Sequence, residues 1–189
     1  MKLIKYIQLL FSLFLTVTVL NSCDTKNKQG TGIITKEIKQ YKFLLQPLTA
    51  NDLFNINYGN KDVDEKEKKI ILAEYETFCC FRFDIKVEGF DKEITEYYDK
   101  ADEKVDYDQL LNYYLFGMQQ DFKLLGMDGS EASCNIYFYE RNFMLTKSNR
   151  FIVGFKKPSK METLTFSYDN RFLSIGKINF QINKNDFKG

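Results

Sequence analysis

The sequence ILAEYETFCCFRFDIKVE, at positions 71–88, carries the clearest structural signal in the chain. Its odd positions, from Ile71 to Val87, are apolar except for Thr77, whereas most of its even positions are charged. Alternation with a period of two predicts a β-strand with one buried face and one solvated face. At this length we expect the strand to be bent, bulged or split in two, and we expect it to end at Gly89.

Beyond Gly89 the apolar period changes from two residues to that of a helix. A short helix is predicted after Asp91, with apolar side chains at Ile94, Tyr97, Tyr98 and Ala101. A stronger helical stripe follows at Tyr107, Leu110, Leu111, Tyr114, Leu115 and Met118. Asp106 is a suitable N-cap for this second helix, and Gln109 stands where a capping box requires it.

Two interpretations are open for the residues after this stripe. The helix could continue through Phe122 and Leu125 to Gly126. Alternatively, it ends near Gln119, and residues 121–126 pair with the following segment across the turn Asp128-Gly129. Because Asp-Gly is a strong hairpin signal, we favour the second interpretation.

The rest of the chain is predicted to be strands. A short apolar run at 41–46 is stopped by Pro47, which favours an edge strand. Four further apolar segments are Cys134 to Phe138, Phe151 to Phe155, Thr163 to Tyr168 and Lys177 to Ile182. Residues 171–175 are expected to pair with 163–168 across the turn Asp169-Asn170. The mixed-charge run 62–69 is interpreted as a solvated loop or the start of a short helix.

These patterns together predict an α+β fold, a mainly antiparallel β-sheet with one or two inserted amphipathic helices. No internal repeat or low-complexity linker divides residues 38–189, so we expect a single globular domain there.

Composition and charge exclude several classes of function. The chain has 189 residues and a formal net charge of +1, without histidine or tryptophan. Lys2 and Lys5 are the only charges within residues 1–22, so the remaining chain carries a net charge of −1. Such a chain has no overall field that would attract it to nucleic acid. The missing histidine removes the commonest metal ligand and the usual general base near neutral pH.

The N-terminus has the pattern of an export signal. The two lysines precede an apolar stretch from Leu9 to Leu20, which is too short to span a bilayer as a helix. The stretch ends in Leu20-Asn21-Ser22-Cys23, which resembles the lipobox of bacterial lipoproteins. The resemblance implies cleavage after residue 22, a diacylglyceryl group on the Cys23 sulfur and acylation of the new amino group.

Location in the cell follows from this resemblance. Residues 23–37 are predicted to be the lipidated cysteine and a flexible tether, because they are polar and contain Gly30 and Gly32. We expect a protein anchored in the cell envelope, with the outer membrane favoured. The inner membrane remains an alternative location, because Asp24 follows the cysteine and aspartate at that position retains some lipoproteins at the inner membrane.

Metal and nucleophile motifs are absent from the sequence. Cys79-Cys80 is a vicinal pair without the spacing of a zinc or redox site, and no histidine could complete it. We therefore predict no metal and no cofactor. If their strands meet, Cys79 and Cys134 are the favoured disulfide pair in an oxidising compartment, and buried free thiols are the alternative.

Two acidic residues are weak catalytic candidates. Glu140 shares parity with Ile136 and Phe138, so a continuous strand would direct its side chain towards the core. It could be a catalytic acid with a shifted pKa, a polar contact to a ligand or a structural ion-pair partner. The same alternatives apply to Asp121. The weak candidates for ligand binding are Tyr97, Tyr98 and Tyr113, which we expect to be partly exposed with Tyr114.

The hypothesis at this stage is a lipid-anchored envelope protein that acts as a non-catalytic binding or structural accessory module. Its expected partners are the membrane, through the anchor, and an envelope protein or glycan. The alternative is a carboxylate-dependent hydrolase of envelope polymer or glycan. A concave pocket with two facing carboxylates about 5–10 Å apart would favour the hydrolase.

Overall fold

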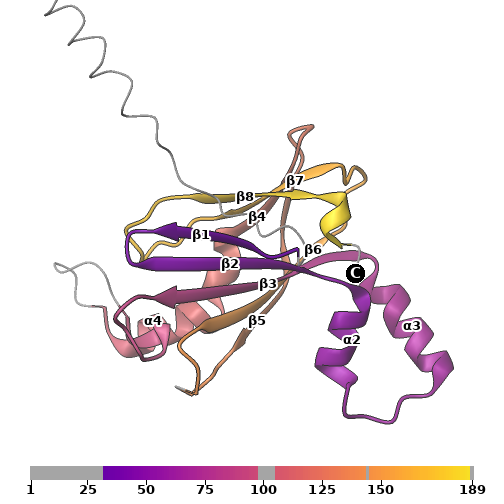
Figure 1. Ribbon diagram of the computed structural model, residues 1–189, viewed down its shortest axis with the longest axis horizontal. Helices are drawn as coiled ribbons and strands as arrows, with labels where there is room; N and C mark the ends of the chain where they lie inside the picture. Colours follow the sequence, from indigo (N-terminus) through magenta and orange to yellow (C-terminus); the bar gives the residue numbers. More distant parts are fainter. Residues whose placement is uncertain (1–31, 98–104, 144, 188–189) are drawn as a thin grey trace, which may run out of the picture.

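A computed structural model describes residues 32–97, 105–143 and 145–187. Within these residues, eight antiparallel strands form one sheet in the order β1-β2-β3-β6-β5-β4-β7-β8. The strands are β1 (Ile34–Ile38), β2 (Tyr41–Leu48), β3 (Phe78–Val87), β4 (Phe122–Gly126), β5 (Glu131–Glu140), β6 (Asn149–Lys156), β7 (Thr163–Tyr168) and β8 (Ile178–Asn183). The sheet curls into a nearly closed barrel that brings β1 near β8 (Figure 1), with Lys36 Nζ 5.4 Å from the centre of the Phe180 ring.

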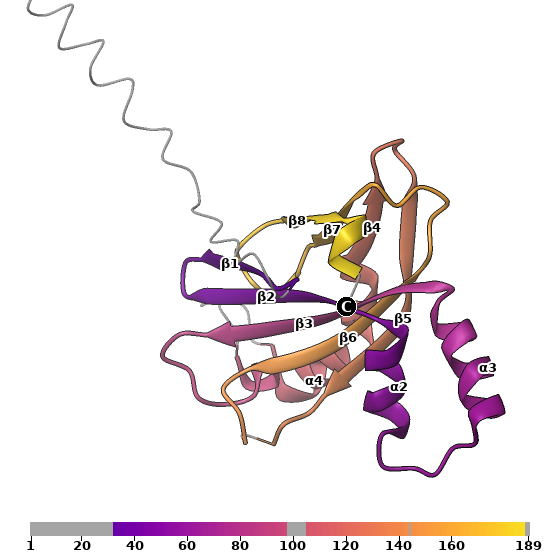
Figure 2. The same cartoon turned by 45° about the vertical axis from the view of Figure 1, so that its right-hand side comes forward.

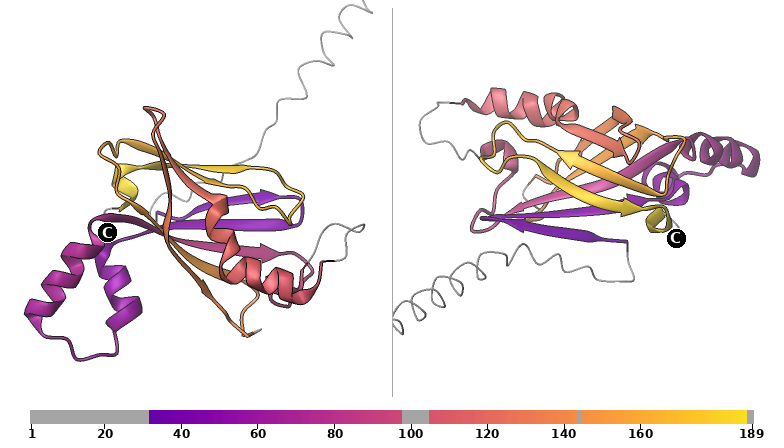
Figure 3. Two further views of the ribbon diagram at one scale, coloured as in Figure 1. Left: turned by 180° about the vertical axis from the view of Figure 1, so that it is seen from behind. Right: turned by 90° about the horizontal axis from the view of Figure 1, so that it is seen from above.

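Among the described residues, helices follow β2, β3 and β8. The α-helices are α2 (Ala50–Tyr58), α3 (Glu65–Tyr75) and α4 (Tyr107–Leu115), and the 3-10 helices are η1 (Ile94–Glu96), η2 (Gly117–Asp121) and η3 (Lys184–Phe187). α2 and α3 form a hairpin at one end of the barrel (Figure 2), and α4 lies towards the other end (Figure 3). The predicted class, an α+β fold with a mainly antiparallel sheet, is confirmed.

The interior of the barrel is filled with aromatic side chains. Phe83, from β3, is fully buried and has five rings within about 6 Å between centroids. Those rings belong to Phe43, Phe122, Phe166, Tyr168 and Phe180. They come from strands on both sides of the barrel, so this cluster holds the curled sheet together.

A second, smaller apolar cluster lies on the outer face of the sheet. It joins Leu53 of α2 to Leu48, Cys80 and Ile152 of the neighbouring strands. α2 is fixed there by a capping box, in which the Thr49 hydroxyl accepts from Asp52 N and the Asp52 carboxylate accepts from Thr49 N. The α2–α3 hairpin therefore covers one end of the outer sheet face.

Several predictions for the middle of the chain are confirmed. The second predicted helix is α4, and the Asp106 side chain caps it by accepting from Gln109 N at 2.8 Å. Residues 122–126 form β4 and pair with β5 across Asp128-Gly129, as the hairpin interpretation required. Strands β6, β7 and β8 also overlap the segments predicted for them at 151–155, 163–168 and 177–182.

The long strand predicted from Ile71 to Val87 is wrong in its first third. Ile71, Ala73 and Tyr75 belong to helix α3, and the strand β3 begins at Phe78. Asp64 caps α3 by accepting hydrogen bonds from two backbone N–H groups. Acidic residues in the first turn stabilise the helix further, because they lie at the positive end of its dipole. From Cys79 to Val87 the buried parity is as predicted, so the split falls at Glu76-Thr77.

The N-terminal boundary of the domain also needs correction. Strand β1 begins at Ile34, inside the segment predicted as a tether, and it takes the edge position that had been expected for β2. Pro47 lies within β2 but beyond Leu45, where pairing with β1 ends. Because proline has no N–H to donate, this position suits it. Residues 23–31, including Cys23, lie outside the described residues.

Two short segments differ from expectation. Residues 171–175 are not a strand, because the Asn170 carboxamide accepts from Phe172 N and Leu173 N and turns the chain, so that β7 pairs with β8. Residues 94–96 form a single 3-10 turn, η1. The predicted helix around them also included Tyr98 and Ala101, which lie outside the described residues.

A β-bulge in β5 reverses the parity predicted for its second half. Cys134 is in register with Phe155 of β6, yet Ile136 is in register with Gly154, so Asn135 is an extra residue. Cys134 faces the core, as do Tyr137 and Tyr139, whereas Ile136, Phe138 and Glu140 face outward. The expectation that Glu140 points towards the core is therefore wrong.

The favoured disulfide does not form. Cys79 and Cys134 are each in register with Phe155, on opposite sides of β6. Two strand spacings of about 4.8 Å separate them, which is well beyond the reach of a disulfide. Cys79, Cys80 and Cys134 are all buried free thiols.

These thiols are expected to be unreactive towards a soluble disulfide reagent at neutral pH. Burial raises the pKa of Cys79 to about 11 and the pKa values of Cys80 and Cys134 to about 12. Because folding raises these pKa values, their contribution to stability is complete below about pH 9 and is lost as the pH rises towards 11 to 12. Thiol counting on the full chain should show slow labelling in buffer and rapid labelling in urea. Rapid labelling of any of the three in the folded protein would contradict the packing.

No helix within the described residues is both long enough and apolar enough to cross a membrane.

Candidate binding groove

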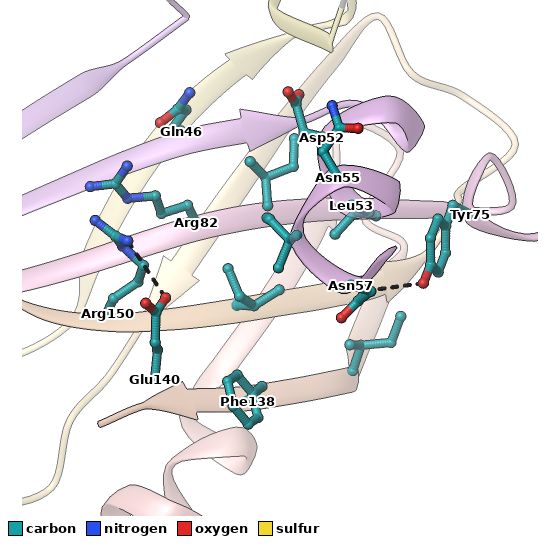
Figure 4. Close-up of a pocket in the computed structure, with 14 residues that line it drawn as sticks. Gln46, Asp52, Leu53, Asn55, Asn57, Tyr75, Arg82, Phe138, Glu140 and Arg150 are labelled. Carbon is teal, nitrogen blue, oxygen red and sulfur yellow. Dashed lines mark hydrogen bonds and ion pairs between the residues drawn. The ribbon is translucent and has the colours of Figure 1, made fainter. Parts of the chain in front are cut away.

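An open groove of about 820 Å³ lies on the outer face of the barrel, between α2 and strand β5. Its volume is within the range of sites that hold drug-sized ligands. The groove is lined by Gln46, Leu48, Asp52, Leu53, Asn55, Ile56, Asn57, Tyr75, Arg82, Ile136, Phe138, Glu140, Arg150 and Ile152 (Figure 4). These residues come from β2, β3, β5, β6 and the α2–α3 hairpin.

The floor of the groove is set by the register of four adjacent strands. Gln46, Arg82, Ile152 and Phe138 form one row across β2, β3, β6 and β5. Ile152 is buried, whereas Phe138 has 61% of its surface exposed. On α2, Ile56 is 56% exposed. The groove therefore offers apolar surface to an occupant on two of its sides.

One end of the groove carries a chain of charges. Asp84 is buried and lies between Arg82, whose Nη2 is 2.5 Å from it, and Arg150, whose Nε is 3.2 Å from it. Arg150 Nη1 also lies 3.5 Å from Glu140 Oε2. The hydrogen bonds to Asp84 raise the pKa of the Arg82 guanidinium above its usual value, so this arginine stays charged.

The opposite end is closed by polar contacts between the two helices. Asn57 Nδ2 donates to the Tyr75 hydroxyl at 3.0 Å and so ties α2 to α3. Figure 4 shows Tyr75 and Asn57 at this end and the two arginines at the other. The site is thus apolar in its middle and carries two arginines, paired with Asp84 and Glu140, at one end, an arrangement suited to orienting an elongated occupant.

Of the candidate catalytic and binding residues that the structure describes, only Glu140 lines the groove. Its side chain is half exposed and contacts Arg150 at the rim. It is not isolated, and its setting matches the ion-pair alternative considered for it. Arg141, the next residue, faces elsewhere and binds the buried carboxylate of Glu93, with Nη2 2.7 Å from Oε2.

Asp121 lies apart from the groove and holds together two neighbouring elements. It accepts a hydrogen bond from the Tyr113 hydroxyl of α4 and one from Arg171 Nη2 at 3.0 Å. Burial raises the pKa of Tyr113, so its hydroxyl remains a donor. These contacts give Asp121 a structural role at the junction of η2 and β4.

The tyrosines expected to be exposed are mostly buried. Tyr113 and Tyr114 are part of the core, so the expectation of partial exposure is wrong for both. Tyr97 is half-buried, and its hydroxyl accepts from Gln40 Nε2 at 2.9 Å. Tyr98 lies outside the described residues. These tyrosines do not form a ligand-binding patch in the described part of the chain.

Arginine was the signal that sequence reasoning missed. The chain has 27 basic residues, of which only Arg82, Arg141, Arg150 and Arg171 are arginines. All four pair with a buried carboxylate, namely Asp84, Glu93 or Asp121. The guanidinium fork suits such pairs better than an ammonium group does. In this lysine-rich chain, the few arginines therefore indicate where acidic side chains are buried.

Within residues 32–97, 105–143 and 145–187, no group of three or more cysteine or acidic side chains is placed to hold a metal ion.

Comparison with known proteins adds little. No family model matches the chain, and no curated protein matches it. A crystal structure of a novel protein of unknown function from Burkholderia pseudomallei is similar over 81% of this chain and 79% of that chain. The sequence identity is 14% and the TM-score is 0.33, so this likeness carries no inference about the present chain.

Proposed function

We propose that the protein is a lipid-anchored module of the cell envelope, with the outer membrane favoured, and that it acts by binding a partner in the groove. The observation that carries this proposal is a groove with exposed apolar walls and two arginines at one end. The lipobox-like sequence at Cys23 supports attachment to a membrane.

The contacts that the acidic residues in and beside the groove already make favour a binding function over hydrolysis. A glycan hydrolase needs two carboxylates free to act on the substrate from either side. In the groove, the Arg150 side chain lies between Asp84 and Glu140 and contacts both. Asp52 is engaged by the Thr49 backbone and hydroxyl at the start of α2. Each of these three carboxylates therefore already has a structural partner.

Lipidation at Cys23 is the first prediction of this proposal. Mass spectrometry of the full protein from its native membrane should show a mature chain that begins at Cys23 and carries the mass of the acyl groups. Cys23→Ala should leave an uncleaved precursor without lipid, because the thiol is the attachment atom. Ser22→Ala, which keeps a small residue before the cleavage site, should be processed normally. A mature chain with an unmodified Cys23 would contradict the anchor.

Rescue of a gene deletion separates binding from hydrolysis. Combined Phe138→Ala and Ile56→Ala should abolish rescue, because these exposed side chains supply apolar contact to the partner. Glu140→Gln should rescue fully, since a binding site does not need an ionisable group there. Met127→Ala, at an exposed position outside the groove, is the matched control. If Glu140→Gln abolishes rescue in a folded, anchored protein and the apolar variant does not, the hydrolase hypothesis replaces this one.

A further inference from the structure

The arginine end of the groove has unused hydrogen-bonding capacity. Arg82 donates to Asp84 through Nε and Nη2, and Arg150 donates to it through Nε. Among the described residues, Arg82 Nη1 and Arg150 Nη2 make no hydrogen bond, and Arg150 Nη1 has only the 3.5 Å ion pair with Glu140 Oε2. Both side chains line the groove and are about one third exposed, at 32% and 35%. Two adjacent guanidinium groups with free donors form a site suited to a carboxylate.

Glu140 occupies the approach to these donors without binding them firmly. Its Oε2 is 3.5 Å from Arg150 Nη1, and half of the side chain is exposed. An exposed ion pair of this kind contributes little to stability. An incoming carboxylate can therefore displace Glu140 at little cost, and until then Glu140 neutralises the second arginine.

The remainder of the groove suits a peptide better than a simple fatty acid. Phe138, Ile152 and Ile56 provide contact for a bulky apolar side chain. Gln46 and Asn55 add carboxamide groups to the lining of the groove (Figure 4), and no described residue hydrogen-bonds either of these amides. A carboxamide both donates and accepts, as the backbone of a bound peptide requires. The hydrocarbon chain of a fatty acid would make no hydrogen bond to these groups.

We propose that the groove binds the C-terminal end of a protein chain. The terminal carboxylate contacts Arg82 and Arg150 in place of Glu140, and an apolar last side chain lies against Phe138 and Ile152. This inference rests on the proposed function and specifies the chemistry of the partner. It depends on charge complementarity at one end of the groove and on apolar contact next to it.

The chain offers a clean reporter, because it contains no tryptophan. Phe138→Trp places a single tryptophan, which can be excited selectively over the tyrosines, in the groove and keeps an aromatic side chain there. Met127→Trp, in the exposed turn between β4 and β5, is the matched control. Both full-length proteins are placed in phosphatidylcholine vesicles and titrated to millimolar concentration. The probe is a pool of acetylated tetrapeptides that end in leucine, randomised without tryptophan at the first three positions. The second titration uses the same pool with its C-termini amidated.

The free-acid pool should change the emission of Trp at position 138 at a concentration at least about tenfold lower than the amidated pool does. Neither pool should affect the control at position 127. Glu140→Gln, added to the reporter, should tighten binding of the acid pool and leave the amidated pool unchanged, because it removes the competing charge. Arg150→Gln should remove the preference for the acid, with folding checked by circular dichroism.

Equal binding of the two pools, or no binding of either, would overturn the inference. Glu140 is half exposed, so the Glu140→Gln result and the acid-to-amide comparison decide the matter even if Arg150→Gln does not fold. The proposed function is tested separately by rescue with the Phe138 and Ile56 variants. If those variants lose rescue but the acid and amidated pools bind equally, the groove remains a binding site. Only the recognition of a C-terminal carboxylate is then rejected.

Discussion

Replacing Phe83 by alanine is expected to lower the free energy of unfolding by about 3–5 kcal/mol. The ring is fully buried, and its centroid lies 5.0 Å from that of Tyr168 and 5.5 Å from that of Phe122. Removing it leaves a cavity at the point where strands from both sides of the barrel meet, and rigid neighbouring rings cannot collapse to fill it. Such a loss is a large part of the 5–15 kcal/mol that stabilises a typical domain.

Urea unfolding of the full chain, followed by circular dichroism, measures this effect. Phe116→Ala is the matched control, because Phe116 is exposed at the end of α4 and its truncation should change stability by no more than about 0.5 kcal/mol. Similar small effects for both variants would show that Phe83 is not at the centre of the core.

Replacing Asp84 by alanine is expected to destabilise the protein by about 3–5 kcal/mol. The buried carboxylate is the shared partner of Arg82 and Arg150, which come from adjacent strands. Without it, two partly buried guanidinium groups face each other with no anion between them, so repulsion adds to the lost hydrogen bonds.

Asp91→Ala provides the comparison for this second variant. Asp91 makes a 2.8 Å ion pair with Lys147, yet both side chains are exposed, so its loss should cost at most about 1 kcal/mol. The two variants are compared by thermal and urea unfolding at low and high salt. A loss for Asp84→Ala as small as that for Asp91→Ala would show that the arginines do not depend on Asp84. The groove would then lack the fixed pair of arginines inferred for its end.

Periodicity predicted the strands well wherever one face is uniformly buried. From Cys79 to Val87 the alternation follows the two faces of β3, because the inner face meets the aromatic core. At Ile71, Ala73 and Tyr75 the same alternation arose by coincidence in a helix. There the N-cap at Asp64 and the charged residues of the first turn outweighed it. Local capping signals therefore deserve more weight than short-range parity near a boundary.

A single inserted residue in β5 prevented prediction of the groove from the sequence alternation. Asn135 shifts the parity of β5, and so Phe138 and Glu140 lie in the groove instead of facing the core. Sequence alternation alone carries no sign of such a bulge. The groove also needs α2, whose capping box at Thr49 and Asp52 was present in the sequence but not recognised. The pairing of its arginines with a buried acid depends on the register of β3 and β6, which sequence alternation does not define.

Site-specific photo-crosslinking in the native membrane tests the central claim most directly, that the groove holds the partner. A benzophenone amino acid replaces Phe138 in the groove or, as the control, Met127 outside it, in the full-length anchored chain. After irradiation of cells, the adducts are detected by mass. The groove position should give a discrete adduct, and the control position should give none. No adduct at position 138, or the same adducts at both positions, would contradict the assignment of the groove as the binding site.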